Sequence, residues 1–272
     1  MPPTEANLLY YFSSLADRHI SHKTMKVYLA AITYFSRLVG FNIATSSMHR
    51  LHFLLRGIRR SQGGRMTKPP RTPITFAHLH ALSAYVAGHY SFQDASMLWA
   101  AFTAAFFGLL RSSEFTAPSE TTLIQSTLLF RHIGFTSSFT EATLFLPLSK
   151  TDPFGTGATV HLFARTAACC PVLVLRRYVP FHPSPAGPLF MFQDGGFLTR
   201  SHVAAVLAIA FPNQPNLNTH SFRIGGASAL AAAGVPEYII QSLGRWSSDS
   251  FLRYIRLPGS AIRAYQLALH DV

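Results

Sequence analysis

Two short segments in the last quarter of the sequence hold residues that could act on a phosphate. His220 and Arg223 are three positions apart, so they share one face if the segment is helical. We expect Thr219 to cap that helix, whose N-terminus would favour an anion. The second segment, residues 244–256, contains Trp246 and Tyr254. A histidine beside an arginine is more often structural than catalytic, so the pair alone does not identify an active site.

Taken together, these segments resemble the tyrosine recombinase (phage-integrase-like) family. The family motif is an arginine, a hairpin lysine, His-x-x-Arg, a His or Trp, and a tyrosine. Six residues stand in this order: Arg111, Lys150, His220, Arg223, Trp246 and Tyr254. The sequences SKTD (149–152), CPV (170–172) and GRW (244–246) are most similar to recombinases of eukaryotic mobile elements of the Crypton or DIRS type.

The resemblance implies that DNA is cleaved and rejoined through a covalent phosphotyrosine at Tyr254. Attack on a phosphodiester builds charge on the nonbridging oxygens, which the guanidiniums of Arg111 and Arg223 could clamp. Lys150 would protonate the leaving 5′ oxygen, and His220 would accept the Tyr254 proton or hydrogen-bond the phosphate. Because the phosphotyrosine stores the bond energy for religation, we expect no ATP. The two guanidiniums would replace the metal ions that other enzymes use, so we expect no metal or other cofactor.

Two adjacent residues compete for the His/Trp position of the motif. Trp246 precedes Tyr254 by eight positions, one fewer than is usual, and an ungapped alignment puts Arg245 there instead. Either an indole N–H or a guanidinium could donate to a phosphate oxygen. The GRW sequence favours Trp246. We expect Glu114 to brace the arginine segment around Arg111 or to act as a cap, and not to react.

The elements that must position these residues are predicted from apolar periodicity, which indicates a mainly α fold with a small antiparallel β-sheet (α+β). The expected helices cover residues 4–18, 22–39, 46–61, 75–88, 92–110, 171–178, 200–211, 220–233, 236–243, 249–255 and 260–269. The expected strands cover residues 127–135, 142–148 and 158–163. Arg111 then follows a buried helix, and Lys150 lies at the tip of a hairpin.

A segment rich in glycine and proline, residues 61–73, predicts a domain boundary. We assign residues 1–65 to a helical, SAM-like DNA core-binding domain, 66–73 to a linker and 74–272 to the catalytic domain. The first domain is short beside the four or five helices usual in the family, so a truncated copy is one interpretation. An apolar stripe in its second helix must pack against something, and bundle core is the simplest interpretation: Met25, Tyr28, Leu29, Ile32, Phe35 and Leu38.

The charge balance favours a polyanionic partner. Lys and Arg number 23 against 11 Asp and Glu, which gives salt-sensitive affinity for phosphate backbones. A generically basic protein explains the same balance. The residues expected to contact double-stranded DNA are Lys23, Lys26, Arg56, Arg59, Arg60, Lys68 and Arg245. The resemblance implies a homo-tetramer on paired DNA sites, with a monomer in isolation possible; helix 260–269 either exchanges between copies or folds back.

Several other classes are disfavoured by the sequence. Cys169 and Cys170 are adjacent, which is poor geometry for a disulfide, and the 13 histidines form no metal-binding motif. The longest apolar stretch is shorter than the roughly 20 residues that span a bilayer, and no leader peptide is apparent.

We expect the nucleus as the location if the chain is eukaryotic, and otherwise the cytoplasm. A type IB topoisomerase and a catalytically idle DNA-binding protein are the competing interpretations.

Overall fold

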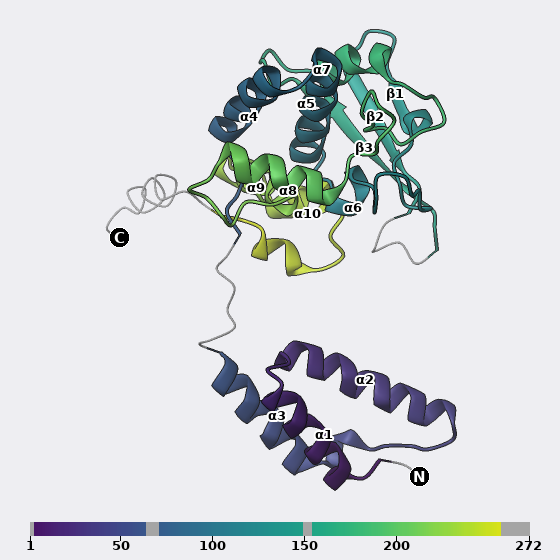
Figure 1. Cartoon of the computed structure of the whole chain (residues 1–272), viewed down its shortest axis with the longest axis vertical. Coiled ribbons are helices and arrows are strands. Elements are labelled where there is room, and N and C mark those ends of the chain that lie inside the picture. The colour runs from purple at the N-terminus through teal and green to yellow at the C-terminus, as the bar shows by residue number, and fades with distance from the viewer. Residues whose placement is uncertain (1–2, 64–70, 149–153, 257–272) are drawn as a thin grey trace. The chain divides into compact units, whose positions relative to one another are not determined.

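The computed structural model describes residues 3–63, 71–148 and 154–256. The chain divides into two compact units, Met1–Pro69 and Pro70–Val272 (Figure 1). The described residues are mainly helical, with a three-stranded antiparallel sheet in the second unit. Among them, no helix combines the length and apolar character needed to cross a bilayer. Residues 66–70 of the predicted linker and the predicted helix 260–269 lie outside the described residues.

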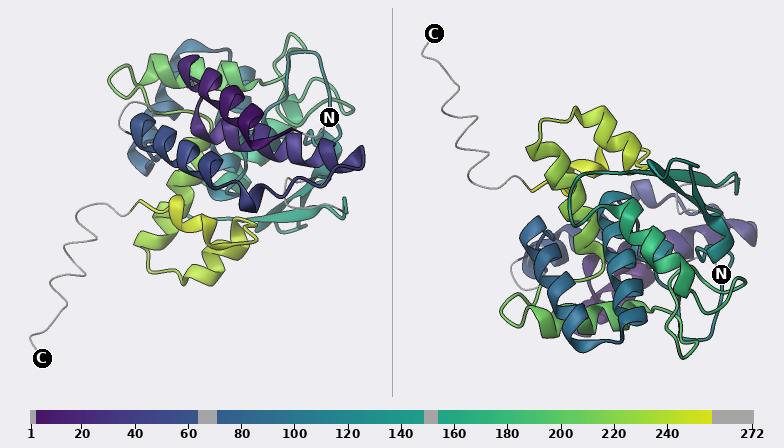
Figure 2. Two further views of the ribbon diagram at one scale, coloured as in Figure 1. Left: turned by 90° about the horizontal axis from the view of Figure 1, so that it is seen from below. Right: turned by 90° about the horizontal axis from the view of Figure 1, so that it is seen from above.

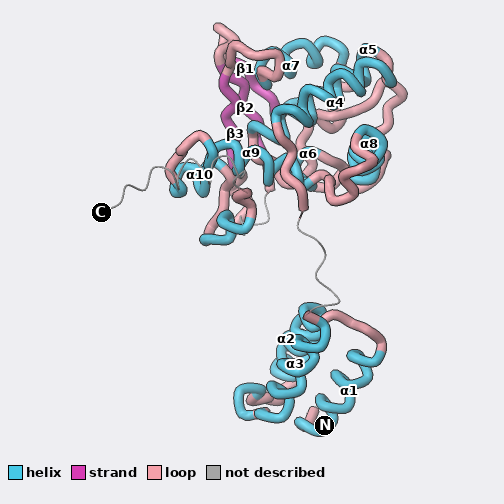
Figure 3. Tube along the Cα trace, turned by 90° about the vertical axis from the view of Figure 1, so that its left-hand side faces the viewer, coloured by secondary structure: helices cyan, strands magenta, loops and turns pink. Residues whose placement is uncertain are grey.

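The first unit consists of three packed helices (Figure 3). Its elements are α1 (Glu5–Asp17), α2 (His22–Leu38), the 3-10 turn η1 (Thr45–Ser47) and α3 (His49–Gln62). Local chemistry starts the first two helices, because the side chains of Thr4 and Ser21 accept hydrogen bonds from backbone N–H groups of the first turns. Seven apolar side chains form the buried core: Leu8, Phe12, Leu15, Met25, Leu51, Leu55 and Ile58.

The expectation that the whole apolar stripe of α2 is core was wrong for its second half. Met25 is buried and Leu29 and Ile32 pack against the core, but Phe35 and Leu38 are each 63% exposed. The end of α3 is tied to the start of α2, where the Gln62 side chain bonds to main-chain groups. Periodicity identifies an amphipathic helix, but it does not show whether a neighbour covers the full length of the apolar face.

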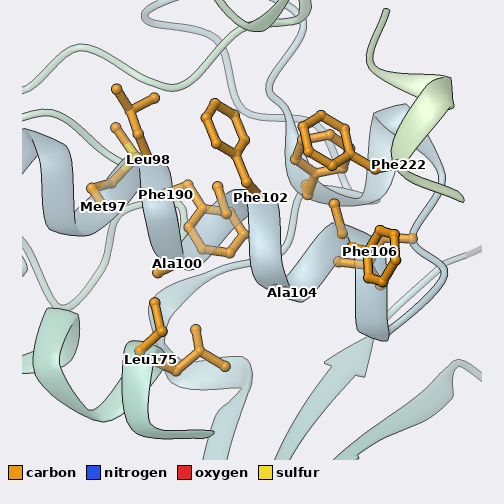
Figure 4. Packing of buried hydrophobic residues seen from close by; sticks show 14 of the residues in the cluster. Met97, Leu98, Ala100, Phe102, Ala104, Phe106, Leu175, Phe190 and Phe222 are labelled. Atoms are coloured by element: carbon orange, nitrogen blue, oxygen red, sulfur yellow. The ribbon is translucent and has the colours of Figure 1, made fainter. Parts of the chain in front are cut away.

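The second unit is built around α5 (Phe92–Phe107), in which ten of the 16 residues are buried. The surrounding helices are α4 (Phe76–His89), α6 (Ser112–Phe115), α7 (Pro171–Tyr178), α8 (Arg200–Ala210), α9 (His220–Ala232) and α10 (Glu237–Leu243), with the 3-10 turns η2 (Phe130–His132), η3 (Val179–Phe181) and η4 (Asp249–Arg253). Figure 4 shows Phe102 of α5 beside Phe222 of α9, and their rings stack with centroids 5.1 Å apart. These contacts fix α9 against α5.

The sheet has the order β1 (Ile133–Phe135), β2 (Glu141–Leu146) and β3 (Ala158–Phe163), with neighbouring strands antiparallel. The predicted first strand, residues 127–135, is too long. Leu128 and Leu129 lie beside residues 187–189 instead, where Leu189 N–H donates to Leu128 O at 2.7 Å. The backbone groups of Leu128 and Leu129 therefore pair with residues 187–189, and they do not extend β1 along β2.

Two adjacent glycines let α9 approach its neighbours at backbone distance. A Cβ on Gly225 would lie 2.0 Å from the carbonyl oxygen of Ile74, and one on Gly226 would lie 2.2 Å from that of Phe106. No other residue fits at either place without moving backbone. This close packing sets the start of α9 beside the end of α5, where the predicted catalytic residues lie.

Candidate active site

The end of α5 carries the chain toward Arg111 through a left-handed turn. After Gly108, Leu109 has a φ of 47°, and Leu110 N–H donates to Ala105 O at 3.1 Å. This is a helix ending in which a left-handed residue turns the chain aside. Glycine usually occupies the left-handed position, yet here it stands one residue earlier, where a Cβ would lie 2.8 Å from Ala104 O.

The end of α10 repeats this arrangement. Gly244 is followed by Arg245 with a φ of 56°, and Trp246 N–H donates to Gln241 O at 3.1 Å. A Cβ on Gly244 would lie 1.6 Å from the Trp246 ring, so glycine is required for the indole to fold back over the helix end. In both views of Figure 2, α10 and η4 (yellow) lie beside the end of α9.

Three arginines join these two helix ends. Arg223 donates through Nη1 to Leu109 O and through Nη2 to Gly244 O. Arg111 donates through Nη2 to Arg245 O at 2.9 Å. Arg245 donates to Gly108 O at 3.2 Å and to Leu109 O at 3.3 Å. The last carbonyls of a helix lack partners within it and carry partial negative charge, so guanidiniums bind them well.

Glu114 is the carboxylate of this cluster. Its oxygens pair with Arg111 Nη1 and with Arg245 Nη2, each at 2.8 Å, and one of them also accepts from Arg111 N–H. The residue is 2% exposed. The expectation that Glu114 braces the arginine segment is confirmed by these contacts.

Tyr254 lies in the same cluster, where its ring packs near those of Trp246 and His220. The guanidinium carbon of Arg223 lies 4.0 Å from the centroid of the Trp246 ring and 5.8 Å from that of Tyr254. The Tyr254 ring is 5.1 Å from Trp246 and 5.0 Å from His220, measured between centroids. Ser228 of α9 donates to Tyr254 O at 3.2 Å, which ties the tyrosine segment to the helix of His220 and Arg223.

The surroundings keep His220 neutral at physiological pH. Burial, together with Arg71, Arg223, Arg200 and Arg111, lowers the pKa of His220 to about 4. Burial also lowers the pKa of Arg223 to about 9, with further lowering by Arg111 and Arg245, so its guanidinium stays charged at pH 7. A neutral imidazole beside a phenol and charged guanidiniums can accept a proton while an anion is held nearby.

Comparison with solved structures identifies the architecture. The fold is that of the tyrosine recombinases. The Tn1549 transposon integrase in complex with circular intermediate DNA matches with a TM-score of 0.59 and 13% identity, covering 97% of this chain and 85% of the integrase chain. The XerH site-specific recombinase in a post-cleavage complex with difH DNA matches with a TM-score of 0.56 and 14% identity, over 92% and 70% of the two chains. The XerA recombinase matches with a TM-score of 0.53 and 13% identity, over 98% and 100%.

The comparisons of sequence gave no match. No protein-family model matches the chain, and no curated protein matches it. At identities of 13 to 14%, the solved structures show a shared fold and nothing finer.

The structure brings together five of the six motif residues: Arg111, His220, Arg223, Trp246 and Tyr254. The sixth, Lys150, lies outside the described residues, as does Lys68. Of the two competitors for the His/Trp position, Trp246 lies against Tyr254. The guanidinium of Arg245 instead points into the protein, with 13% of the side chain exposed.

The expected cap of α9 was wrong. Thr219 has helical backbone angles and its side chain makes no capping bond, because its position belongs already to the turn that opens the helix. Asn218 does this work one residue earlier. Its side-chain oxygen accepts from His220 N–H at 2.9 Å, and its own N–H donates to Ser221 Oγ at 3.1 Å.

The basic residues predicted to contact DNA in the first unit are at its surface. Lys23 and Lys26 of α2, and Arg56, Arg59 and Arg60 of α3, are all exposed. Burial lowers the pKa of His22, and the charges of Lys26 in α2 and Arg59 in α3 lower it further. Both charges therefore lie near His22, which brings basic residues of the two helices close to each other. Their contact with DNA stays a prediction.

Two arginines near His220 were missed by the sequence analysis. Arg71 and Arg200 are exposed, and both lower the pKa of His220. Arg71 precedes Ile74, whose N–H donates to Ser221 O at 3.0 Å. Arg200 opens α8, where a cation is unfavourable because the helix N-terminus is itself positive.

Within the described ranges, no group of three or more His, Cys, Asp or Glu side chains is arranged to hold a metal ion.

Proposed function

We propose that this protein is a site-specific DNA recombinase that cleaves and rejoins DNA through a 3′-phosphotyrosyl bond at Tyr254. The observation that carries the proposal is the convergence of Tyr254 with His220, Arg223 and Trp246, at centroid distances of 4.0 to 5.8 Å. The chain shares its fold with the Tn1549 integrase and XerH, both solved with DNA. A DNA recombinase accounts for the fold and for the residue types of the cluster together.

In the proposed reaction, the scissile phosphate binds against Arg111 and Arg223. The two carbonyls bonded to Arg223 use two of the five N–H groups of a guanidinium, so donors remain for a nonbridging oxygen. Because Arg223 is 1% exposed, a neighbouring group has to move aside before the phosphate reaches them. Preorganised donors of this kind stabilise the charge that develops in the transition state. The bonds to Leu109 and Gly244 hold the guanidinium in place before DNA arrives.

Proton transfer is assigned to His220 and Lys150. His220, whose pKa is about 4, is neutral at pH 7 and accepts the Tyr254 proton as the phenol oxygen attacks phosphorus. The P–O bond to the 5′ oxygen breaks, and Lys150 donates a proton to that oxygen. Trp246 supports the site by packing between Arg223 and Tyr254. Reversal of the same steps rejoins a strand, so ATP and metal ions are not needed.

The biological setting is part of the proposal. The GRW and SKTD sequences support a role in the integration or excision of a mobile element of the Crypton or DIRS type, with action in the nucleus of a eukaryotic host. We assign the first unit to DNA core binding, because its exposed lysines and arginines lie on adjoining helices. Recombination of two duplexes calls for four active sites, which favours a homo-tetramer on paired sites.

The test is covalent trapping on a nicked duplex, from which the short fragment that carries the freed 5′ hydroxyl diffuses away after cleavage. With end-labelled DNA from the flanks of the element, wild-type protein should form a labelled adduct that resists denaturation. Tyr254→Phe should bind the same DNA and form none. Tyr238→Phe is the matched control, because Tyr238 of α10 is 69% exposed, and it should behave as wild type.

Two results would favour the competing interpretations. A protein that binds DNA tightly but forms no adduct, with or without Tyr254, is a binding protein without catalysis. An adduct accompanied by relaxation of supercoils, but by no exchange between two sites, indicates a type IB topoisomerase. The recombinase proposal requires both the adduct and strand exchange.

A further inference from the structure

Arg245 is an arginine that the proposed reaction does not use. Its side chain is 13% exposed and its Nη2 lies 2.8 Å from Glu114 Oε2. The same guanidinium donates to the carbonyls of Gly108 and Leu109, which end α5. Its backbone is left-handed, with a φ of 56°. Its carbonyl oxygen accepts from Arg111 Nη2, so both the main chain and the side chain of Arg245 are bonded within the cluster.

Glu114 connects Arg245 to Arg111. One carboxylate oxygen accepts from Arg111 Nη1, and the other accepts from both Arg111 N–H and Arg245 Nη2, all at 2.8 Å. With Arg111 as its sole cationic partner, a buried carboxylate would cancel the charge that Arg111 offers to a phosphate. With Arg245 present, the carboxylate is shared between two cations.

The cluster has an excess of positive charge. Arg111, Arg223 and Arg245 exceed Glu114 by two positive charges. The C-terminal ends of α5 and α10 each contribute roughly half a negative charge, which leaves about one positive charge. Removal of Arg245 would lower this sum by one positive charge, and the attraction of the cluster for an anion would weaken.

We propose that Arg245 is a positioning residue that neutralises Glu114 and so keeps Arg111 attractive to a phosphate oxygen. The main chain adds to this effect, because Arg245 O accepts from Arg111 Nη2 at 2.9 Å and orients that guanidinium. The proposal rests on the proposed function and deepens it. It also explains the spacing of the motif: Arg245 takes a place inside the cluster, and the next residue, Trp246, lies against Tyr254.

A double-mutant cycle separates this role from direct contact with DNA. The rate of adduct formation on the nicked duplex is measured for wild type, Arg245→Ala, Glu114→Gln and the double variant. Arg245→Ala should slow the reaction on the order of 100-fold, since a small misplacement of a catalytic group has an effect of that size. In the double variant, Glu114→Gln removes the carboxylate charge that would otherwise pair with Arg111 alone. The double variant should therefore react about 10-fold faster than Arg245→Ala, the equivalent of 1.4 kcal/mol.

The controls keep the result interpretable. Arg177→Ala changes an exposed arginine of α7 in the same unit and should leave the rate unchanged. If Arg245→Ala does not fold, as judged by thermal unfolding, Arg245→Lys and Arg245→Gln replace it. Lysine keeps the charge beside Glu114 and glutamine does not, so the lysine variant should react faster.

The outcomes point in different directions. If the double variant is as slow as Arg245→Ala, or slower, Arg245 does not act through Glu114 and the inference is overturned. The same holds if the lysine and glutamine variants react equally fast. If wild-type protein forms no adduct, the proposed recombinase function fails first, and that failure is seen before any variant is compared.

Discussion

Helices α2 and α5 have nearly the same length, 17 and 16 residues, but very different surroundings. Ten residues of α5 are buried, on every side of the helix, whereas two residues of α2 are. α5 packs against α4, α7 and α9, so its end is fixed and can hold Leu109 and Arg111 in place. α2 leaves Phe35, Leu38 and Val39 at the surface. The proposed catalytic residues therefore lie at the end of the more deeply buried helix.

The largest expected effect sharpens this contrast at Gly226 of α9. Gly226→Ala would push a methyl group to within 2.2 Å of Phe106 O, a clash with backbone that side-chain rotation cannot relieve. The second unit should lose about 3 kcal/mol of stability. Urea unfolding followed by tryptophan fluorescence measures this, because both tryptophans, Trp99 and Trp246, are in that unit.

A helical glycine of the first unit provides the control. Gly57 of α3 has nothing within 4 Å of a built Cβ. Gly57→Ala should stabilise that unit by about 0.5 to 1 kcal/mol, since alanine loses less backbone entropy on folding. Circular dichroism follows this transition. A similar loss of stability in both variants would contradict the contrast between the two units.

A smaller effect is expected from pH through His220. The folded protein protonates this ring near pH 4, and the unfolded chain does so near the ordinary value of about 6.5. The unfolded state binds more protons between these values, so stability falls as pH is lowered through that window. Between pH 7 and 5 the contribution should be about 1 kcal/mol, after allowance for the partial exposure of the ring.

The measurement compares wild type with His220→Asn in urea unfolding at pH 7 and pH 5. The variant should lose less stability than wild type over that interval, because it lacks the titrating ring. Equal losses in the two proteins would show that His220 titrates near its ordinary pKa, and the proposed acceptor role at neutral pH would lose its support.

The smallest effect is expected at the exposed end of α2. Leu38→Lys replaces a side chain that is 63% exposed, so stability should change by about 0.5 kcal/mol at most. Met25→Ala, in the buried half of the same helix, should cost about 2 kcal/mol or more. Chemical unfolding of the first unit compares them. A loss at Leu38 as large as that at Met25 would mean that this face is covered in solution.

The sequence alone determined where most helices begin and which residue types the site needs. Caps such as Ser21 and Thr199 act on the N–H groups of the next turn, so the start of a helix is encoded locally. α7 was predicted at its observed bounds, Pro171–Tyr178. The order of the motif residues predicted that Arg111, His220, Arg223 and Tyr254 form one site, because cleavage of a phosphodiester needs a nucleophile, a proton acceptor and cations together.

Tertiary structure decided the rest. Two contacts join segments that are more than 100 residues apart in the sequence. Arg245 donates to Glu114, which also pairs with Arg111, and Arg223 donates to Leu109 O at the end of α5. The uncovered half of α2 likewise depends on which helices are present to meet it. Residue spacing fixes which side chains share a face of one element, but long-range contacts depend on how several elements pack, and that information is not local.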